Sequence, residues 1–137
     1  MTDPKLLFKN VTLGNITLNN RIGVAPMART SATFEGVATN QMVSYYTSFA
    51  RGGFGLIITE AIYTDDKHSQ GYFYNPGLIN EEQTQAWKKV VDSVHQAGAK
   101  IFAQIMHAGS LSQGNRFYSR NNWTIGCATK RKTNGIL

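Results

Sequence analysis

The chain has 137 residues, a formal net charge of +6 and a hydrophobic content of 42%. This length suits one domain or part of one, and the hydrophobic content is ordinary for a globular core. No run approaches the ~18 apolar residues of a membrane span, and no apolar segment typical of a secretion signal follows Lys5 and Lys9. The single cysteine, Cys127, excludes an internal disulfide and favours a cytoplasmic protein.

The positive charge is unevenly distributed. Residues 1–92 carry eight acidic and eight basic side chains, whereas residues 93–137 carry six basic side chains and no acidic one. A basic surface over a whole domain would favour binding to nucleic acid. Because the first 92 residues are neutral in sum, we expect no nucleic-acid partner. We interpret Lys130-Arg131-Lys132 as part of an unusual basic tail.

Residues 11–18 open the chain's regular structure. Apolar and polar residues alternate there around Gly14-Asn15, which predicts a hairpin with a two-residue turn. A short strand is expected over residues 21–25, and Pro26 ends it because proline has no amide hydrogen to donate to a sheet. The polar, glycine-containing residues 29–38 predict a loop.

Two helices and two more strands follow. Thr39 or Asn40 can cap a helix that ends at Gly52-Gly53, and Asn80 can cap a second helix that ends at Gly98. Strands are expected over residues 54–61 and 101–106.

The order strand–helix–strand–helix–strand predicts a parallel sheet with right-handed crossovers. Two architectures fit, a doubly wound sheet and a (β/α)₈ barrel. No Gly-x-Gly-x-x-Gly follows a strand, which weakens the first, and three strands cannot close a barrel of eight strands and ~250 residues. In either fold, ligands bind past the carboxyl ends of the strands. The segment after Pro26, with the small residues Ala28 and Thr30, is therefore a candidate binding edge.

Common catalytic and metal motifs are absent. The sequence has no Cys-x-x-Cys, His-Glu-x-x-His, Walker loop or Gly-x-Ser-x-Gly, and we expect no metal site. Of the scattered histidines His68, His95 and His107, we interpret His95 as a surface or packing residue. His107 follows a strand, and we interpret it as a residue that orients a loop.

Two polar residues interrupt the apolar strands. An unpaired buried amide costs ~1–3 kcal/mol, so Gln104 must find partners. Its adjacent donor and acceptor match an imide such as the edge of a flavin or a base, but the neighbouring loop backbone is an equal alternative. Glu60 could be a base, or could pair with Arg21 or Arg29. We favour the structural pair, since the sequence supplies the partners.

Four segments share a wider pattern. They are Asn20-Arg21-Ile22 with Ala25-Pro26-Met27, Leu56-Ile57-Ile58-Thr59-Glu60-Ala61, Pro76-Gly77-Leu78, and Gln104-Ile105-Met106-His107-Ala108-Gly109. In this order and spacing they resemble the old yellow enzyme family of FMN-dependent oxidoreductases. The resemblance covers roughly residues 5 to 122.

The resemblance implies a TIM (β/α)₈ barrel with FMN at the carboxyl ends of its strands. The fold expected for this chain is α/β: the N-terminal part of such a barrel, about three βα units, preceded by a β-hairpin. The resemblance also implies the flavin contacts. They are Ala25, Pro26, Met27 and Ala28 through their backbone, Ala61, whose small side chain lets the ring approach, and Gln104, which bonds the pyrimidine. Thr30 falls where relatives often contact the substrate.

The implied reaction passes a hydride from NAD(P)H to the flavin and then to an activated alkene, usually a small enone. In the family, the residues that hold the substrate carbonyl and supply the proton come from the fourth strand, so no catalytic residue is assigned here. The resemblance leaves open the natural substrate, the choice between NADH and NADPH, and the oligomeric state. A truncated chain of this kind is expected to be inactive alone. The competing hypothesis is a small non-catalytic βα module that binds a nucleotide or a protein partner.

The last residues depart from the family pattern. We expect residues 1–122 to be the barrel portion and residues 123–137 to be a frameshifted, non-family tail. A shifted reading frame over these codons permits the Gly-Pro-Ser-Ala-Val-Gln-Pro-Lys-Gly-like loop with which relatives continue. The alternative is a genuine short protein with a disordered basic tail.

Overall fold

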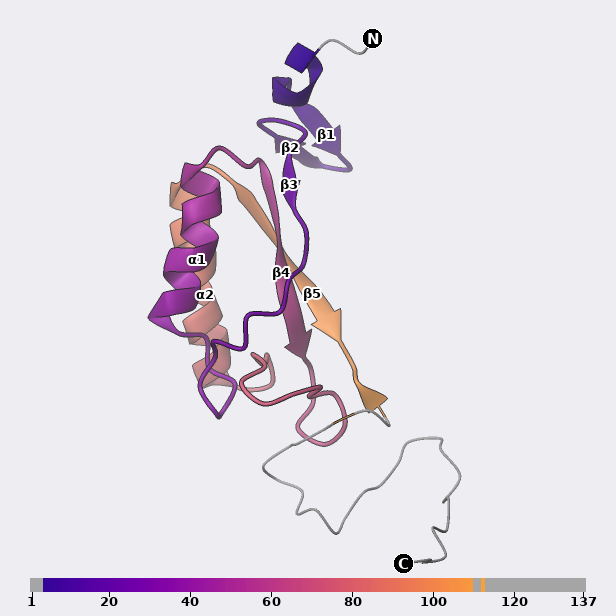
Figure 1. Ribbon diagram of the computed structural model, residues 1–137, viewed down its shortest axis with the longest axis vertical. Coiled ribbons are helices and arrows are strands. Elements are labelled where there is room, and N and C mark those ends of the chain that lie inside the picture. The colour runs from indigo at the N-terminus through magenta and orange to yellow at the C-terminus, as the bar shows by residue number, and fades with distance from the viewer. Residues whose placement is uncertain (1–3, 110–111, 113–137) are drawn as a thin grey trace, which may run out of the picture.

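The computed structural model describes residues 4–109 and residue 112 (Figure 1). A short 3-10 helix, η1 (Pro4–Phe8), precedes an antiparallel hairpin of β1 (Val11–Leu13) and β2 (Ile16–Leu18). Gly14 has a φ of 56°, a left-handed conformation that favours glycine and suits the tight turn between the two strands. The predicted hairpin is therefore confirmed.

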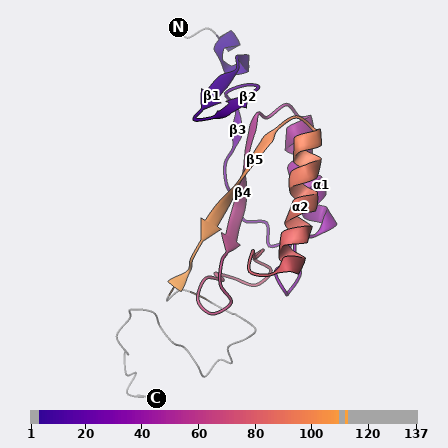
Figure 2. The same cartoon turned by 180° about the vertical axis from the view of Figure 1, so that it is seen from behind.

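The main sheet has three parallel strands, β3 (Gly23–Val24), β4 (Leu56–Tyr63) and β5 (Lys100–Met106), in the order β3-β4-β5. The crossover helices α1 (Asn40–Arg51) and α2 (Glu81–Gln96) pack against each other and cover one face of this sheet, as both views show (Figures 1 and 2). The strand–helix alternation predicted a parallel sheet, and the structure has one.

The strands differ in length from the prediction. The first is only two residues long, because its pairing with β4 stops at Val24 opposite Ile57 and Pro26 follows shortly after. The second continues beyond the expected end, because its pairing with β5 extends to Tyr63 opposite Met106.

The two helices begin and end at the signals in the sequence. The Thr39 hydroxyl accepts a hydrogen bond from the Met42 amide, and the Asn80 side chain accepts one from the Gln83 amide. Each side chain satisfies a backbone donor that has no partner within its helix. After the helices, Gly53 and Gly98 adopt φ angles of 88° and 91°. Local sequence alone was sufficient to locate both helices.

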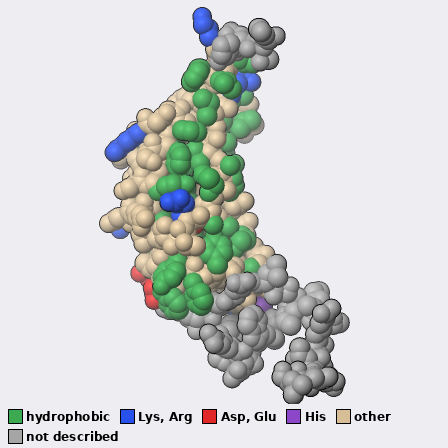
Figure 3. Space-filling view, viewed as in Figure 1, with side chains coloured by type: hydrophobic (Ala, Val, Ile, Leu, Met, Phe, Trp, Pro, Cys, Tyr) green, Lys and Arg blue, Asp and Glu red, His purple; other side chains and the backbone are tan. Residues whose placement is uncertain are grey.

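The hydrophobic core lies between the sheet and the two helices. It is formed by residues that are nearly all inaccessible to solvent: Val24, Ala32, Met42, Tyr46, Ala50, Ile57, Ile62, Trp87, Val90, Val94 and Ala99. The opposite face of the sheet has no covering element among the described residues. Figure 3 shows hydrophobic side chains gathered along the molecule on this side. On β5, Phe102 lies on this face and remains 42% exposed.

Tyr63 closes the carboxyl end of β4. Its ring packs so tightly against Gly36 and Gly77 that a Cβ atom at either glycine would overlap it. Its hydroxyl donates to the Glu35 carbonyl at 3.3 Å and accepts from Gln83 Nε2 at 2.8 Å. One side chain therefore joins the loop after β3, the loop after β4 and the first turn of α2.

No helix within residues 4–109 combines the length and apolar character needed to cross a bilayer. Cys127, the basic run Lys130–Lys132 and the proposed frameshifted tail all lie outside the described residues, so the domain boundary at residue 122 stays a prediction.

Candidate functional site

A β-bulge lies near the carboxyl end of β4. Ile58 pairs with Phe102, and Ala61 pairs with Gln104, so β4 uses three steps where β5 uses two. The extra residue falls in Thr59-Glu60. Bulges are common beside binding sites because they change the direction in which the following side chains point.

The bulge places Ala61 and Gln104 on the face of the sheet that the helices leave open. Ile57 and Ile62 belong to the helix-facing core, so alternation puts Ile58 and Ala61 on the opposite face. Gln104, opposite Ala61 in the register, shares that face. Ala61 and Gln104, which were each predicted from the sequence to contact the flavin, are therefore neighbours.

The Gln104 side chain is exposed, and its side-chain carboxamide has no hydrogen bond to any described residue. The expected burial of this side chain is therefore wrong, and the alternative in which the neighbouring loop backbone binds it is not observed within residues 4–109 and 112. The reason is that nothing in the described chain covers this face. No described residue occupies the donor or the acceptor of this side-chain carboxamide, which together match an imide.

The segment after β3 borders the same end of the sheet. Met27 and Ala28 are exposed, as is Ala25, and Pro26 is half-buried. The backbone amides of Met27 and Ala28 form no hydrogen bond within the part of the chain that the structure describes. The predicted backbone contacts are thus accessible, next to the strand that carries Ala61.

Glu60 holds this segment in place. Its Oε2 accepts the Arg29 amide at 3.0 Å, and its Oε1 accepts the Tyr46 hydroxyl of α1 at 3.2 Å. Tyr46 Oη in turn accepts the Glu60 amide at 2.9 Å. Burial raises the pKa of the Glu60 carboxyl above its usual range, although the Arg29 amide and the Tyr46 hydroxyl both favour the ionised form. Burial also raises the pKa of Tyr46, which keeps its hydroxyl as a donor.

Glu60 thus has the structural role expected of it. The expected partner, however, was an arginine guanidinium. The carboxylate instead binds the Arg29 backbone, and the Arg29 guanidinium lies 4.6 Å from the centre of the Tyr45 ring. Arg29 and Tyr45 also help to line a hollow of about 320 Å³ between this segment and α1. Thr30, the candidate substrate contact, is exposed and has a φ of 50°, and its hydroxyl donates to the Arg29 carbonyl.

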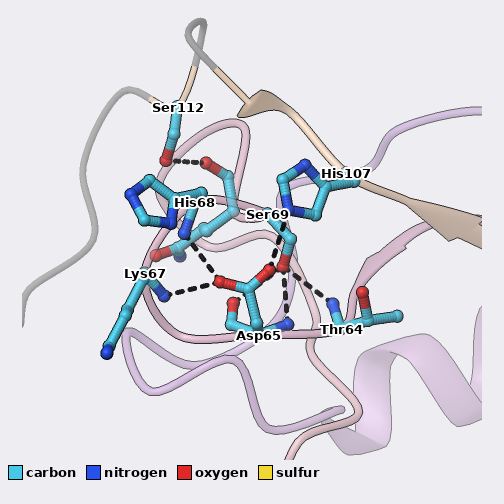
Figure 4. A network of polar contacts seen from close by, with 8 residues as sticks. Thr64, Asp65, Lys67, His68, Ser69, His107 and Ser112 are labelled. Carbon is cyan, nitrogen blue, oxygen red and sulfur yellow. Dashed lines mark hydrogen bonds and ion pairs between the residues drawn. The ribbon is translucent and has the colours of Figure 1, made fainter. Parts of the chain in front are cut away.

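A polar network joins the loops that follow β4 and β5 (Figure 4). Asp65 Oδ1 accepts the amides of Lys67 and His68, and Asp65 Oδ2 lies 3.1 Å from His107 Nε2. Burial alone would raise the pKa of Asp65, but these amides, the Ser69 hydroxyl and His107 together hold that pKa below its ordinary value. His107 orients a loop here, as expected.

Tyr72 was missed by the sequence analysis. Its hydroxyl is buried and has no hydrogen-bond partner among the described residues, and burial and the nearby Glu60 charge raise its pKa. A buried hydroxyl without a partner is a rare feature that suits a ligand contact. The only sequence signal was its place in a loop beyond a strand end. No group of three or more His, Cys, Asp or Glu side chains suited to a metal ion occurs within the described residues.

Comparison with known proteins defines the class. The model of the NADH:flavin oxidoreductase / NADH oxidase family matches residues 6–130. An NADPH dehydrogenase of Listeria monocytogenes is 41% identical over 104 residues, which are 75% of this chain and 30% of that protein.

Two solved structures have the same fold over most of the chain. The old yellow enzyme homologue of Zymomonas mobilis has a TM-score of 0.70 and 39% identity over 76% of this chain and 28% of its own. Morphinone reductase, solved in complex with tetrahydroNAD, has a TM-score of 0.71 and 37% identity over 77% and 28%.

The chain therefore belongs to the NADH:flavin oxidoreductase / NADH oxidase family, and the resemblance to old yellow enzymes is confirmed. Its structural relatives are TIM barrels. The chain spans less than a third of the length of each relative described above.

Proposed function

We propose that this chain forms the flavin-facing wall of an FMN-dependent NAD(P)H oxidoreductase of the ene-reductase type, as the first three βα units of a TIM barrel. The observation that carries this proposal is the pairing of Ala61 with Gln104 on the open face, beside the exposed segment Ala25–Ala28. Membership of the NADH:flavin oxidoreductase / NADH oxidase family supports it, and so does the similarity to an NADPH dehydrogenase of Listeria.

The residues present fit FMN. Gln104 offers a side-chain donor and acceptor for an imide, and Ala61 leaves room beside the sheet. The backbone amides of Met27 and Ala28, which no described residue accepts, can donate to ring atoms. The Tyr72 hydroxyl, which has no partner among the described residues, adds a buried donor near the same end. When bound, FMN would carry the hydride between NAD(P)H and an activated alkene such as an enone. The task of this chain is to bind and orient the ring, with Thr30 as the proposed substrate contact.

We further propose that the chain by itself neither retains FMN nor turns over. It would supply only part of the ring contacts, and the phosphate site of TIM barrels commonly lies near the last two strands. A cytoplasmic, small-molecule enzyme without a nucleic-acid partner is the corresponding expectation.

The test adds FMN and NADPH to the purified 137-residue chain, and follows retained flavin absorbance after gel filtration and enone-dependent loss of NADPH. Weak flavin binding at millimolar FMN, without retention or turnover, is expected. Tight retention with turnover would contradict the inactivity.

A chimera decides the wider proposal. Residues 6–109 replace the matching segment of the Listeria NADPH dehydrogenase, and yellow colour with enone-dependent turnover is expected. A colourless, folded chimera would instead favour the small non-catalytic module.

A further inference from the structure

The Thr59–Glu60 bulge contacts each segment to which a flavin role is proposed. Glu60 binds the Arg29 amide and so fixes the end of the segment Ala25–Ala28. On the other side, Thr59 Oγ1 accepts the Gln104 amide at 3.0 Å and donates to the Glu60 carbonyl at 2.8 Å. Ala61 is the next residue of β4. Two consecutive residues therefore contact the loop that follows β3 on one side and the strand β5 on the other.

The bulge also determines which face each side chain occupies. If the same residues formed a regular strand with no bulge, strict alternation from Ile57 would place Ala61 on the helix side and Ile62 on the open side. With it, Ile62 is 1% exposed in the core and Ala61 lies on the open face. The Glu60 carboxylate meanwhile points toward α1, where it meets Tyr46.

We propose that Thr59 and Glu60 are positioning residues that align the three flavin-facing segments, and that this bulge sets the affinity of the site for the isoalloxazine ring. This inference rests on the proposed function. Both side chains are nearly fully buried, at 2% and 1% exposure, so neither would touch the ligand itself. Each would act through a backbone amide that it holds.

The chain contains a matched control. Thr47 is a second buried threonine, 7% exposed, and its hydroxyl has no hydrogen-bond partner within residues 4–109 and 112. Thr59→Val and Thr47→Val make the same chemical change. Only the first removes an acceptor from a strand that carries a proposed flavin contact.

The experiment uses the ¹⁵N-labelled 137-residue chain and measures amide hydrogen exchange together with the shifts caused by millimolar FMN. Loss of one hydrogen bond to Thr59 should speed exchange of the Gln104 amide by about tenfold in Thr59→Val. Glu60→Gln should do the same at the Arg29 amide, because a neutral acceptor is weaker than a carboxylate. Both variants should reduce the FMN-induced shifts at Ala28, Ala61 and Gln104. Thr47→Val should leave exchange and flavin response unchanged, and Thr59→Ser should restore both.

The outcomes separate the two claims. If the unsubstituted chain responds to FMN and both variants respond equally, the bulge does not position the site and the inference is overturned, while the proposed function stands. If the unsubstituted chain gives no response, the proposed flavin face fails and the inference fails with it. Should a variant not fold, the same substitutions in the Listeria chimera, read out as the FMN dissociation constant, decide the matter by the same criteria.

Discussion

The two faces of the sheet are made from similar residues and have opposite surroundings. On the helix side, Ile57, Val90 and Val94 are completely buried, whereas on the open side Phe102 is 42% exposed and the Gln104 side-chain carboxamide has no described partner. An apolar strand sequence therefore indicates that both faces of the strand can be buried, but it does not indicate which element covers each face. The described residues complete one face, and the other presents its groups to whatever packs or binds there.

Neighbouring isoleucines test the contrast most strongly. Ile57→Ala should lower the free energy of unfolding by about 3 kcal/mol, because it leaves a cavity in the core. Ile58→Ala, on the open face, should cost about 1 kcal/mol or less. Urea unfolding of both variants measures the difference, and equal losses would mean that the open face is packed in solution.

Two glutamines provide the polar counterpart. Gln83 is 1% exposed, accepts the Ile79 amide at 2.8 Å and donates to both the Glu35 carbonyl and the Tyr63 hydroxyl. Gln83→Leu should therefore cost about 2 kcal/mol, since it leaves buried groups unpaired.

On the open face, Gln104→Leu should change the stability of the isolated chain by no more than about 0.5 kcal/mol. The same unfolding experiment compares the two leucine variants. A large loss for Gln104→Leu would show that its amide already has a partner.

Two carboxyl groups five residues apart should respond oppositely to pH. The pKa of Glu60 is raised in the folded protein, so the folded state binds more protons than the unfolded state above the usual glutamate range. Its contribution to stability is present at acid pH and is lost as the pH rises through the folded pKa. Glu60→Gln should flatten this part of the profile of unfolding free energy between pH 4 and 8. Parallel profiles for the two proteins would refute the assignment.

Asp65 should show the reverse and smaller effect. Its pKa is lowered, so its contribution is present above the ordinary aspartate pKa and is lost as the pH falls through the folded value. Its side chain is 37% exposed, so Asp65→Asn should cost about 1 kcal/mol or less at pH 7, and the difference should shrink below pH 4. Asp66→Asn is the control, because Asp66 makes none of these contacts.

Local signals predicted the hairpin, both helix caps and the strand–helix order, because each depends on residues close together in the chain. The bulge could not be predicted, since Thr59-Glu60 has no distinctive turn residue and the register is set by pairing with β5 some forty residues away. For the same reason, the sequence suggested a side-chain partner for Glu60 but not the Arg29 amide.

In the candidate site, too, some features could be predicted from local sequence and others depend on distant contacts. The motifs selected Ala61 and Gln104, but their adjacency follows from the register. Tyr72 was missed because its importance depends on burial of one oxygen atom, which composition does not reveal.

The packing of Tyr63 between two glycines also limits how such a sequence can vary. Gly36 has a φ of 75°, so its backbone favours glycine whatever the size of residue 63. Gly77 has no such conformation; the atoms nearest to the position of its missing Cβ belong to the Tyr63 ring and the Gln83 side chain. Among homologous sequences, position 36 should therefore be glycine regardless of residue 63, whereas a side chain at position 77 should appear together with a smaller residue at 63. The two glycines that pack against Tyr63 should therefore behave differently in an alignment. Position 36 should be invariant, and position 77 should covary with position 63.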